Sequence, residues 1–270
     1  MKNIFKQSLY TIIALTCTLT LVVPPAMASH AWGNYHWART TPSFTLQLKN
    51  SMTSQWQPSL AGAVADWNVS AVLDFASQTS KRKRNCAGTD GMVETCNAAY
   101  GNNGWLGIAQ IWVSGDHITK GIVKLNDTYY STSSYNTPAW RNLVVCQEIG
   151  HTLGLGHNDE DFSTTNGTCM DYSNDPIPNQ HPDAHDYDML ASIYTHLDSF
   201  NSYAAAGTGG GKGKPSRVGQ EIDLSSVQNW GEVVKTDALN NPSLYKRSLS
   251  NGEIVFTHVT WVPDFENYAK

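Results

Sequence analysis

Residues 146–157 of this 270-residue chain read Cys-Gln-Glu-Ile-Gly-His-Thr-Leu-Gly-Leu-Gly-His. Four residues make about one helical turn, so Gln147 and His151 project from the same face of a helix, where two side chains can reach one metal ion. Glu148 lies beside that face. Gly154 allows the backbone to turn sharply after the helix, and the turn brings His157 back towards the same point. The stretch therefore predicts a metal centre with an adjacent carboxylate.

The spacing of these residues is that of the motif His-Glu-x-x-His-x-x-Gly-x-x-His, with Gln147 in place of the first histidine. The chain resembles the metzincin clan of secreted zinc endopeptidases, which carry this motif. Met170 lies a short loop after His157, where metzincins have a methionine in a tight turn beneath the metal. Tyr172 matches the position of a tyrosine that the astacin and serralysin branches place near the zinc. The resemblance covers about residues 40–200.

This resemblance implies a zinc-dependent endopeptidase that hydrolyses proteins or peptides. It implies that Gln147, His151 and His157 hold Zn²⁺ and that Glu148 acts as the general base towards a metal-bound water. Tyr172 would be an additional ligand or a donor to the transition-state oxyanion. Gly154 and Met170 would have structural roles in the two turns that surround the metal.

Gln147 predicts a weakened zinc site, because a neutral amide oxygen is a poorer zinc donor than an imidazole. Losing a partner that only hydrogen-bonds to a metal ligand costs about 10- to 100-fold in affinity, so a weaker ligand costs at least as much. Two hypotheses follow. One is a working peptidase, and the alternative is a catalytically impaired metzincin-like domain that acts as a secreted binding or structural module. The retained Glu148 favours the first, because a purely structural site has no use for an acid beside its metal.

Several other side chains could complete the metal shell, and for each of them a role other than metal binding is the stronger interpretation. The acidic run at residues 159–161 is more typical of a solvated surface, or of a weak Ca²⁺ site, than of zinc ligands. The histidines of the loop before the last helix are expected to face solvent. A structural metal role for His117, which follows a Gly-Asp turn, is conceivable but not favoured. The candidates considered for the shell are Tyr172, Asp159, Asp161, His181 and His185.

Residues 1–28 have the features of a secretory signal peptide, with Lys2 and Lys6 before an apolar run and Ala26-Met27-Ala28 at its end. The apolar run is short and interrupted by threonines, so no stable membrane insertion is expected. The predicted location is extracellular or periplasmic. The whole chain has 18 basic and 23 acidic residues, and removal of the two lysines leaves 16 basic residues and a net charge of −7. Such an acidic chain gives no indication of a nucleic-acid partner.

Cleavage after residue 28 also removes Cys17 and leaves four cysteines in an oxidising compartment, which predicts two disulfides. Four cysteines allow three connectivities. The favoured pairing is Cys86 with Cys96, which closes a short polar loop, and Cys146 with Cys169. The second bridge would tie the metal helix to the segment around Met170.

The order of the predicted elements favours an α+β fold, with strands first and helices later. The resemblance implies a metzincin-like twisted mixed sheet packed on the active-site helix, with a lower subdomain that contains the methionine turn and a C-terminal helix. Strands are expected at residues 44–48, 108–113 and 118–125, and helices from Pro58, from Thr137 as N-cap, and over about residues 186–197 with Asp186 as N-cap.

The mature chain is expected to contain one domain over residues 29–202, a Gly-rich linker over 203–216 and a small tail over 217–270. Within the tail, two β-prone runs flank Ser250-Asn251-Gly252, which predicts a hairpin. A lone hairpin is only marginally stable in water, so the tail either packs on the main domain or binds another partner.

Overall fold

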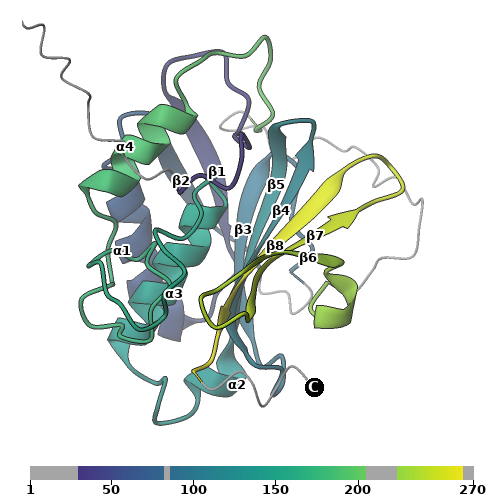
Figure 1. The fold of residues 1–270 in the computed structure, drawn as a ribbon. Helices are drawn as coiled ribbons and strands as arrows, with labels where there is room; N and C mark the ends of the chain where they lie inside the picture. The colour runs from purple at the N-terminus through teal and green to yellow at the C-terminus, as the bar shows by residue number, and fades with distance from the viewer. Residues whose placement is uncertain (1–29, 82–85, 205–223, 264–270) are drawn as a thin grey trace, which may run out of the picture.

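The computed structural model describes residues 30–81, 86–204 and 224–263. The predicted signal peptide and nearly all of the predicted linker lie outside these residues. Over the described part, one mixed sheet of eight strands runs through the molecule in the order β2-β1-β3-β5-β4-β8-β7-β6 (Figure 1). The strands are β1 Phe44–Asn50, β2 Leu73–Thr79, β3 Met92–Ala98, β4 Trp105–Ser114, β5 His117–Asn126, β6 Glu232–Thr236, β7 Pro242–Ser248 and β8 Ile254–Trp261.

The longer helices lie together on one side of this sheet (Figure 1). They are α1 Gln57–Trp67, α3 Pro138–His151 and α4 Ala184–Ile193, and the shorter helical segments are α2 Asp127–Tyr130, η1 Ser54–Trp56 and η2 Val227–Asn229. The main core fills the layer between the helices and the sheet and contains Trp67, Val144 and Met170. The predicted α+β class and the mixed sheet are therefore confirmed.

Helix α3 begins where its local sequence predicts. Thr137 is the N-cap, its side chain accepts a hydrogen bond from the Trp140 backbone N–H, and Pro138 occupies the first turn. Helix α4 begins differently from the prediction. Its N-cap is Asp183, and Asp186 lies three residues inside the helix, where the two side chains form a reciprocal capping box. Aspartates three residues apart can fill either role, and the sequence-based choice of Asp186 as the cap was wrong.

Strands β2, β3 and β6 were not predicted from the sequence, because they lack a clean alternation of apolar and polar residues. β3, the clearest case, reads Met-Val-Glu-Thr-Cys-Asn-Ala and is buried on both faces between β1 and β5. Its polar side chains are satisfied by neighbours inside the protein; Glu94, for example, accepts a hydrogen bond from Ser51. The predicted end of the last helix was also too late, because α4 stops at Ile193.

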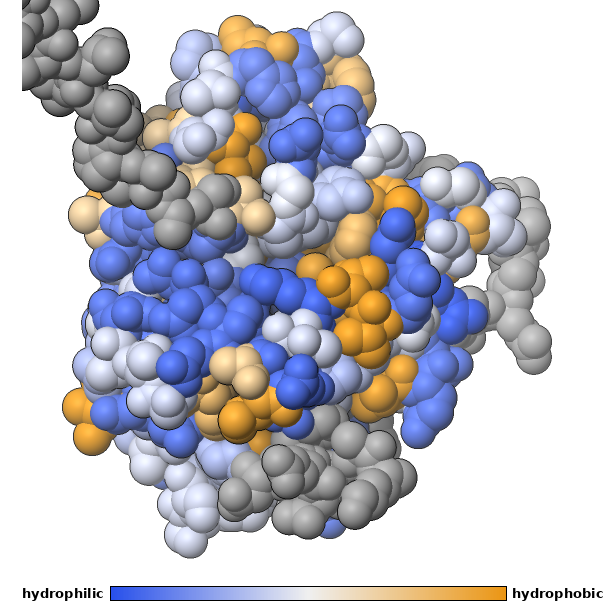
Figure 2. All heavy atoms as spheres, in the orientation of Figure 1, coloured by the Kyte–Doolittle hydropathy of each residue, from blue (hydrophilic) through white to orange (hydrophobic). Residues whose placement is uncertain are grey.

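The C-terminal strands are continuous with the main sheet. β8 pairs antiparallel with both β7 and β4, so the predicted hairpin around residues 250–252 is present and packs on the rest of the molecule (Figure 1, yellow). The surface in this view is largely hydrophilic, with hydrophobic side chains grouped beside the C-terminal strands (Figure 2). Both favoured disulfides, Cys86–Cys96 and Cys146–Cys169, are present. None of the helices described is long and apolar enough to cross a bilayer.

Candidate metal centre

Helix α3 places the motif residues deep in the protein, between α1 and the sheet. The side chains of Glu148 and His151 have no exposed surface. The helix approaches β4 closely at Gly107, where a Cβ atom would lie 2.5 Å from Val144 Cγ1 and 2.7 Å from Glu148 Oε1. The absence of a side chain at Gly107 thus makes room for the carboxyl group of Glu148.

Gly107→Ala is therefore expected to lower the free energy of unfolding by about 1–3 kcal/mol, because α3 cannot retreat from β4 without losing packing. Urea unfolding measures the change. Gly62→Ala in α1 is the matched control, since a Cβ there would meet no atom within 4 Å. This control should raise the stability by about 0.5–1 kcal/mol. Equal effects of the two substitutions would contradict the steric account.

His151 and His157 meet at their Nε2 atoms, which lie 3.1 Å apart. The Nδ1–H group of His151 donates to the Leu155 carbonyl at 2.8 Å, and that of His157 donates to Glu160 Oε1 at 3.1 Å. Both acceptors lack a hydrogen, so each neutral imidazole carries its free lone pair on Nε2. Two lone pairs that face each other repel, and a cation between them, either a proton or a metal ion, removes the conflict.

The turn that brings His157 to this position depends on Gly154, as predicted. Gly154 has a φ of +102°, and a Cβ atom there would lie 2.4 Å from the Tyr35 carbonyl oxygen. Leu155 then forms an antiparallel bridge with Ala31, which holds the chain after the turn. A residue with a side chain would be strained at Gly154 by both its backbone angle and its contact.

Glu160 is a functional neighbour that the sequence interpretation missed, because it belongs to an acidic run of solvated appearance. Its carboxylate contacts His157 and Lys235 of β6. Burial opposes ionisation, but these two partners outweigh it and lower the pKa of Glu160 to about 2. An ionised Glu160 therefore fixes the ring orientation of His157.

Both the nitrogen and the oxygen of the Gln147 amide form hydrogen bonds inside the protein. Its Nε2 donates to the carbonyl oxygens of Cys169 at 3.0 Å and Asp171 at 2.7 Å, and its Oε1 accepts from the Thr260 hydroxyl at 2.6 Å. Gln147 therefore ties helix α3 to the turn around Met170. The oxygen that would serve as a metal ligand is engaged by Thr260 in this arrangement.

Met170 packs directly against helix α3. It is fully buried, and its sulfur would lie 2.4 Å from a Cβ atom placed on Gly150. The Cys146–Cys169 disulfide and the Gln147 hydrogen bonds connect the same turn to α3. The segment around Met170 is therefore packed tightly against α3 and linked to it by a disulfide and by hydrogen bonds.

Glu148 is buried without a charged partner. Its Oε1 lies 2.8 Å from the Thr260 hydroxyl, whose single hydrogen it shares with Gln147 Oε1, and its Oε2 has no hydrogen-bond partner. Burial raises the pKa of Glu148 to about 8, although the Thr260 hydrogen bond acts in the opposite direction. In this closed arrangement the carboxyl group is therefore mainly protonated at neutral pH.

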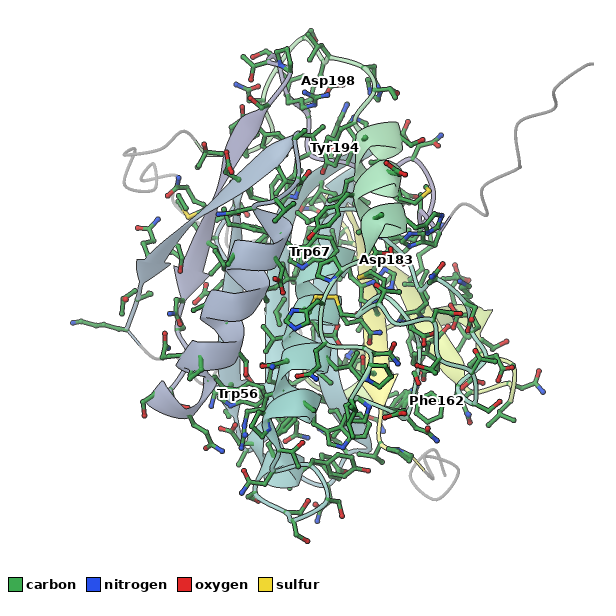
Figure 3. All side chains as sticks on the ribbon, turned by 90° about the vertical axis from the view of Figure 1, so that its left-hand side faces the viewer. Trp56, Trp67, Phe162, Asp183, Tyr194 and Asp198 are labelled. Atoms are coloured by element: carbon green, nitrogen blue, oxygen red, sulfur yellow. A yellow bond between two sulfur atoms is a disulfide. The ribbon has the colours of Figure 1, made fainter. Side chains whose placement is uncertain are left out.

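Tyr172 packs against the candidate metal centre from another side. Its ring stacks on His157 at a centroid distance of 4.6 Å. Phe162, which is labelled in Figure 3, packs on Tyr172 at 5.0 Å. Burial raises the pKa of Tyr172 well above its usual value, and a hydrogen bond with the Trp261 backbone lowers it in part. The hydroxyl group is thus engaged by β8.

The C-terminal strand β8 contributes two side chains that no sequence pattern indicated. Thr260 pairs with Gly107 of β4, and His258 pairs with Ala109, so both project from β8 over the metal helix. The His258 ring stacks on that of His151, with centroids 4.0 Å apart and an angle of 14°. Burial, followed by the nearby His151, lowers the pKa of His258 well below its usual value, and its Nε2 has no hydrogen-bond partner.

The remaining sequence candidates lie away from the paired imidazoles. Asp159 accepts hydrogen bonds from Thr164 and Asn166 within its own surface loop. Asp161 caps Ser163 in that loop, and His181 is exposed and bonds to Asp66. Among the described residues, the carboxylates of 159–161 do not form a group with metal-ligand spacing. His185 lies next to His30 instead.

Comparison with known proteins gives a weak likeness. No protein-family model and no curated protein matches this chain. Among solved structures, the chain is similar to high choriolytic enzyme 1, a hatching enzyme zinc-protease from Oryzias latipes (medaka fish). The two are 14% identical with a TM-score of 0.35, over 61% of this chain and 97% of that one. Because this likeness is weak, the function of the chain has to be argued from its own residues.

Proposed function

We propose that this chain is a secreted zinc metalloendopeptidase of metzincin type, in which Glu148 is the general base. The observation that carries the proposal is the pair of Nε2 lone pairs of His151 and His157, 3.1 Å apart, with both tautomers set by acceptors on Nδ1. Imidazole nitrogens about this far apart suit neighbouring ligands of one tetrahedral zinc ion. The order of motif residues in the sequence supports the same interpretation.

Two side chains compete to be the third ligand. Gln147 stands at the motif position, but its oxygen is engaged by Thr260. His258 is a softer donor, is stacked on His151 and has a buried Nε2 without a partner. A third imidazole supplied by β8 would replace the histidine that the motif lacks. In the present arrangement the ligand atoms of His258, His151 and His157 do not all lie within 4.8 Å of one another, so His258 could join the ion only after a shift of β8. We favour His258 as the third ligand of that shifted arrangement, because the amide of Gln147 is engaged with the segment around Met170.

The protein side chains supply the other parts of hydrolysis. Zn²⁺ bound here would lower the pKa of a water molecule and polarise the peptide carbonyl. Glu148 Oε2 is the atom that takes the proton and later delivers it to the leaving amine. Glu160 holds His157 in position, and the Tyr172 hydroxyl, once free of the Trp261 backbone, would donate to the oxyanion.

Substrate access requires a change at β8. Thr260 covers both Gln147 and Glu148, and β8 occupies the edge of β4 over the metal helix. An extended peptide could pair with β4 only after β8 had moved away from that edge. We infer that the present arrangement is a closed form, in which Glu148 is protonated and shielded from water.

The alternative, a catalytically impaired binding or structural module, is favoured by one observation. The amide of Gln147 is satisfied by three partners that lock α3, the methionine turn and β8 together. This network stabilises the closed arrangement whether or not a metal is bound. A binding or structural module in which β8 never moves away from β4 would need neither a bound metal ion nor a general base.

His157→Ala is expected to remove one equivalent of bound zinc and to abolish cleavage of an unfolded protein substrate, because only one of the two paired imidazoles remains. Zinc is measured by elemental analysis of the secreted mature protein, and cleavage by gel electrophoresis with and without a chelator. Unchanged zinc in the variant, together with no chelator-sensitive cleavage by the wild type, would overturn the proposal.

The substitution Gln147→His distinguishes a working peptidase from a catalytically impaired module. If the wild type is a working peptidase that uses His258, this substitution should break the hydrogen bonds of Gln147 and give no gain in cleavage rate. A variant that cleaves at a high rate when the wild type is inactive would support the impaired module. Both results are read in the same cleavage assay.

A further inference from the structure

Three imidazoles and one carboxylate meet at a second place in the molecule, in the loops beyond α4 (Figure 3, label Asp198). The Nε2 atoms of His36, His117 and His196 lie 3.5, 3.2 and 3.6 Å from the same atom, Asp198 Oδ1. The Nε2 atoms of His36 and His196 are 3.1 Å apart. Four potential ligand atoms thus converge on one point.

The spacing of these atoms is that of a tetrahedral zinc site. Zinc binds imidazole nitrogen and carboxylate oxygen at about 2.0–2.2 Å, so neighbouring ligand atoms of a tetrahedron lie roughly 3.3–3.5 Å apart. Four distances within this cluster, from 3.1 to 3.6 Å, bracket that value. The ligand atoms of His36, His117 and Asp198 all lie within 4.8 Å of one another, and the exposed His196 ring, which is not part of that group, would have to turn to complete the tetrahedron.

The neutral His36 ring directs its free lone pair into the cluster. His36 Nδ1–H donates to the Asn34 carbonyl at 2.7 Å, so in the neutral ring the lone pair is on Nε2. That lone pair faces His196 Nε2 and the Asp198 carboxylate. Asp198 Oδ1 lies 3.2 Å from His117 Nε2 as well. A metal ion between these atoms would attract both the lone pair of His36 and the carboxylate.

Backbone hydrogen bonds hold the segments that carry the cluster. His36 and His117 form a parallel bridge, in which Ile118 N–H donates to the His36 carbonyl at 2.7 Å. The second carboxylate oxygen of Asp198 accepts from Arg39 N–H at 2.9 Å, and Asp198 N–H donates to the Arg39 carbonyl. The ligands are thus held by neighbours that do not themselves bind the ion, which is the usual support of a metal site.

We propose that His36, His117, His196 and Asp198 form a structural zinc site. With His196 turned towards the ion, four protein ligands would close the tetrahedron and leave no position for a substrate, which would distinguish this site from a catalytic one. The ion would join the N-terminal segment, the start of β5 and the loop after α4, whose ligands are 81 and 160 residues apart in sequence. This proposal is independent of the peptidase proposal, because none of its ligands belongs to the metal helix.

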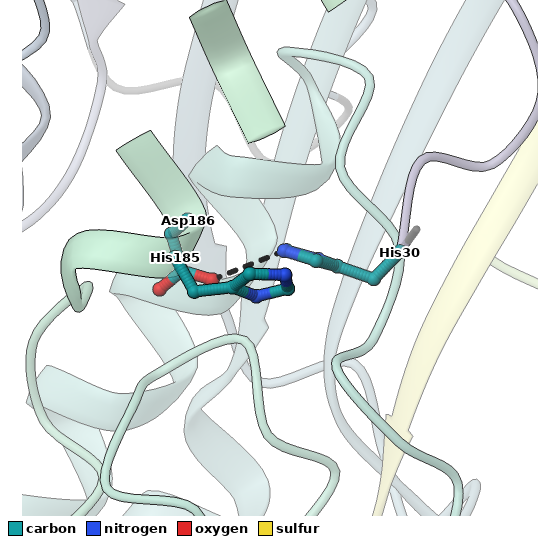
Figure 4. Close-up of side chains that lie close together, drawn as sticks. All are labelled: His30, His185 and Asp186. Atoms are coloured by element: carbon teal, nitrogen blue, oxygen red, sulfur yellow. Dashed lines mark ion pairs between the residues drawn. The ribbon is translucent and has the colours of Figure 1, made fainter. Parts of the chain in front are cut away.

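A second cluster of histidine and aspartate side chains has fewer potential ligands. His30, His185 and Asp186 lie close together, with His30 Nε2 3.4 Å from Asp186 Oδ1 (Figure 4). Burial lowers the pKa of His30 to about 4 and raises that of Asp186 to about 6. This cluster offers two imidazoles and one carboxylate, one imidazole fewer than the cluster at Asp198.

The test compares zinc retained by the full mature chain and by three variants, after removal of metal, reloading with Zn²⁺ alone and desalting. His196→Ala and Asp198→Asn should each lose one equivalent relative to the wild type. Asn can still accept the Arg39 hydrogen bond, and His196 lies at the surface, so both variants should fold. His181→Ala, which removes an exposed histidine paired with Asp66, is the matched control and should lose none.

Cobalt and thermal unfolding supply the second measurement. Co²⁺ loaded into the wild type should show the strong visible absorption of a four-coordinate ion, and this signal should fall in Asp198→Asn but not in His181→Ala. Zinc should raise the unfolding midpoint more in the wild type than in Asp198→Asn. If both site variants retain the zinc content and the zinc-dependent midpoint shift of the wild type, the proposal is wrong. Loss of zinc on His157→Ala but not on His196→Ala would leave the metal helix as the zinc site and reject this one.

Discussion

Glu148→Gln is expected to lower the rate of peptide hydrolysis at least about 100-fold while the zinc content stays unchanged. An amide has the shape of a carboxyl group but cannot take a proton from water at neutral pH. The fold should tolerate the exchange, because the amide oxygen can still accept from Thr260, and the atom replaced by NH₂ has no hydrogen-bond partner. The measurement is the initial rate of cleavage with equal amounts of zinc-loaded protein.

Glu232→Gln is the matched control for this experiment. Glu232 lies on β6 with an exposed side chain, so the same chemical change occurs far from the metal helix. The control should retain the wild-type rate within a factor of two or so, as a surface substitution usually does. If Glu148→Gln keeps more than a tenth of the activity, another residue is the general base and the role assigned to Glu148 is wrong.

Replacing Cys146 and Cys169 by alanine is expected to lower the free energy of unfolding by about 3.4 kcal/mol. The bridge spans 23 residues, and the estimate is the loop-closure entropy that the unfolded chain regains when it is cut. The turn around Met170 should loosen as well, because the Cys169 carbonyl accepts from Gln147. Urea unfolding under non-oxidising and oxidising conditions separates the contribution of the disulfide from that of the side chains.

The Cys86–Cys96 bridge provides the internal comparison. It spans 10 residues, so the same relation gives about 2.7 kcal/mol for its removal. It also lies in a separate cluster of buried side chains with Trp112, away from the metal helix. Removal of Cys146–Cys169 should therefore reduce zinc retention and stability together, whereas removal of Cys86–Cys96 should reduce stability alone. Equal loss of zinc in both variants would contradict a specific link between the first bridge and the metal site.

Local patterns were sufficient for helix α3 and its immediate surroundings. Thr137 and Pro138 define the start of the helix by hydrogen bonding and backbone angle, which depend on residues within one turn. The position of Gly154 was predictable for the same reason, since the turn needs a positive φ. The start of α4 shows the limit of such rules, because Asp183 and Asp186 both fit a cap and only the folded backbone distinguishes them.

The sequence by itself determined the α+β class, the α3 helix with its ordered Glu148, His151 and His157, and the number of disulfides, whereas the structure selected one of the three possible pairings. These features follow from spacing over a few residues or from the small number of cysteines. Only the tertiary structure decided that β8 joins β4, which brings His258 and Thr260 over the metal helix. It also decided that His36, His117, His196 and Asp198 meet at one point. Both results depend on pairing between segments far apart in the chain, and the free energy of such pairing comes from burial and hydrogen bonds that no local pattern contains.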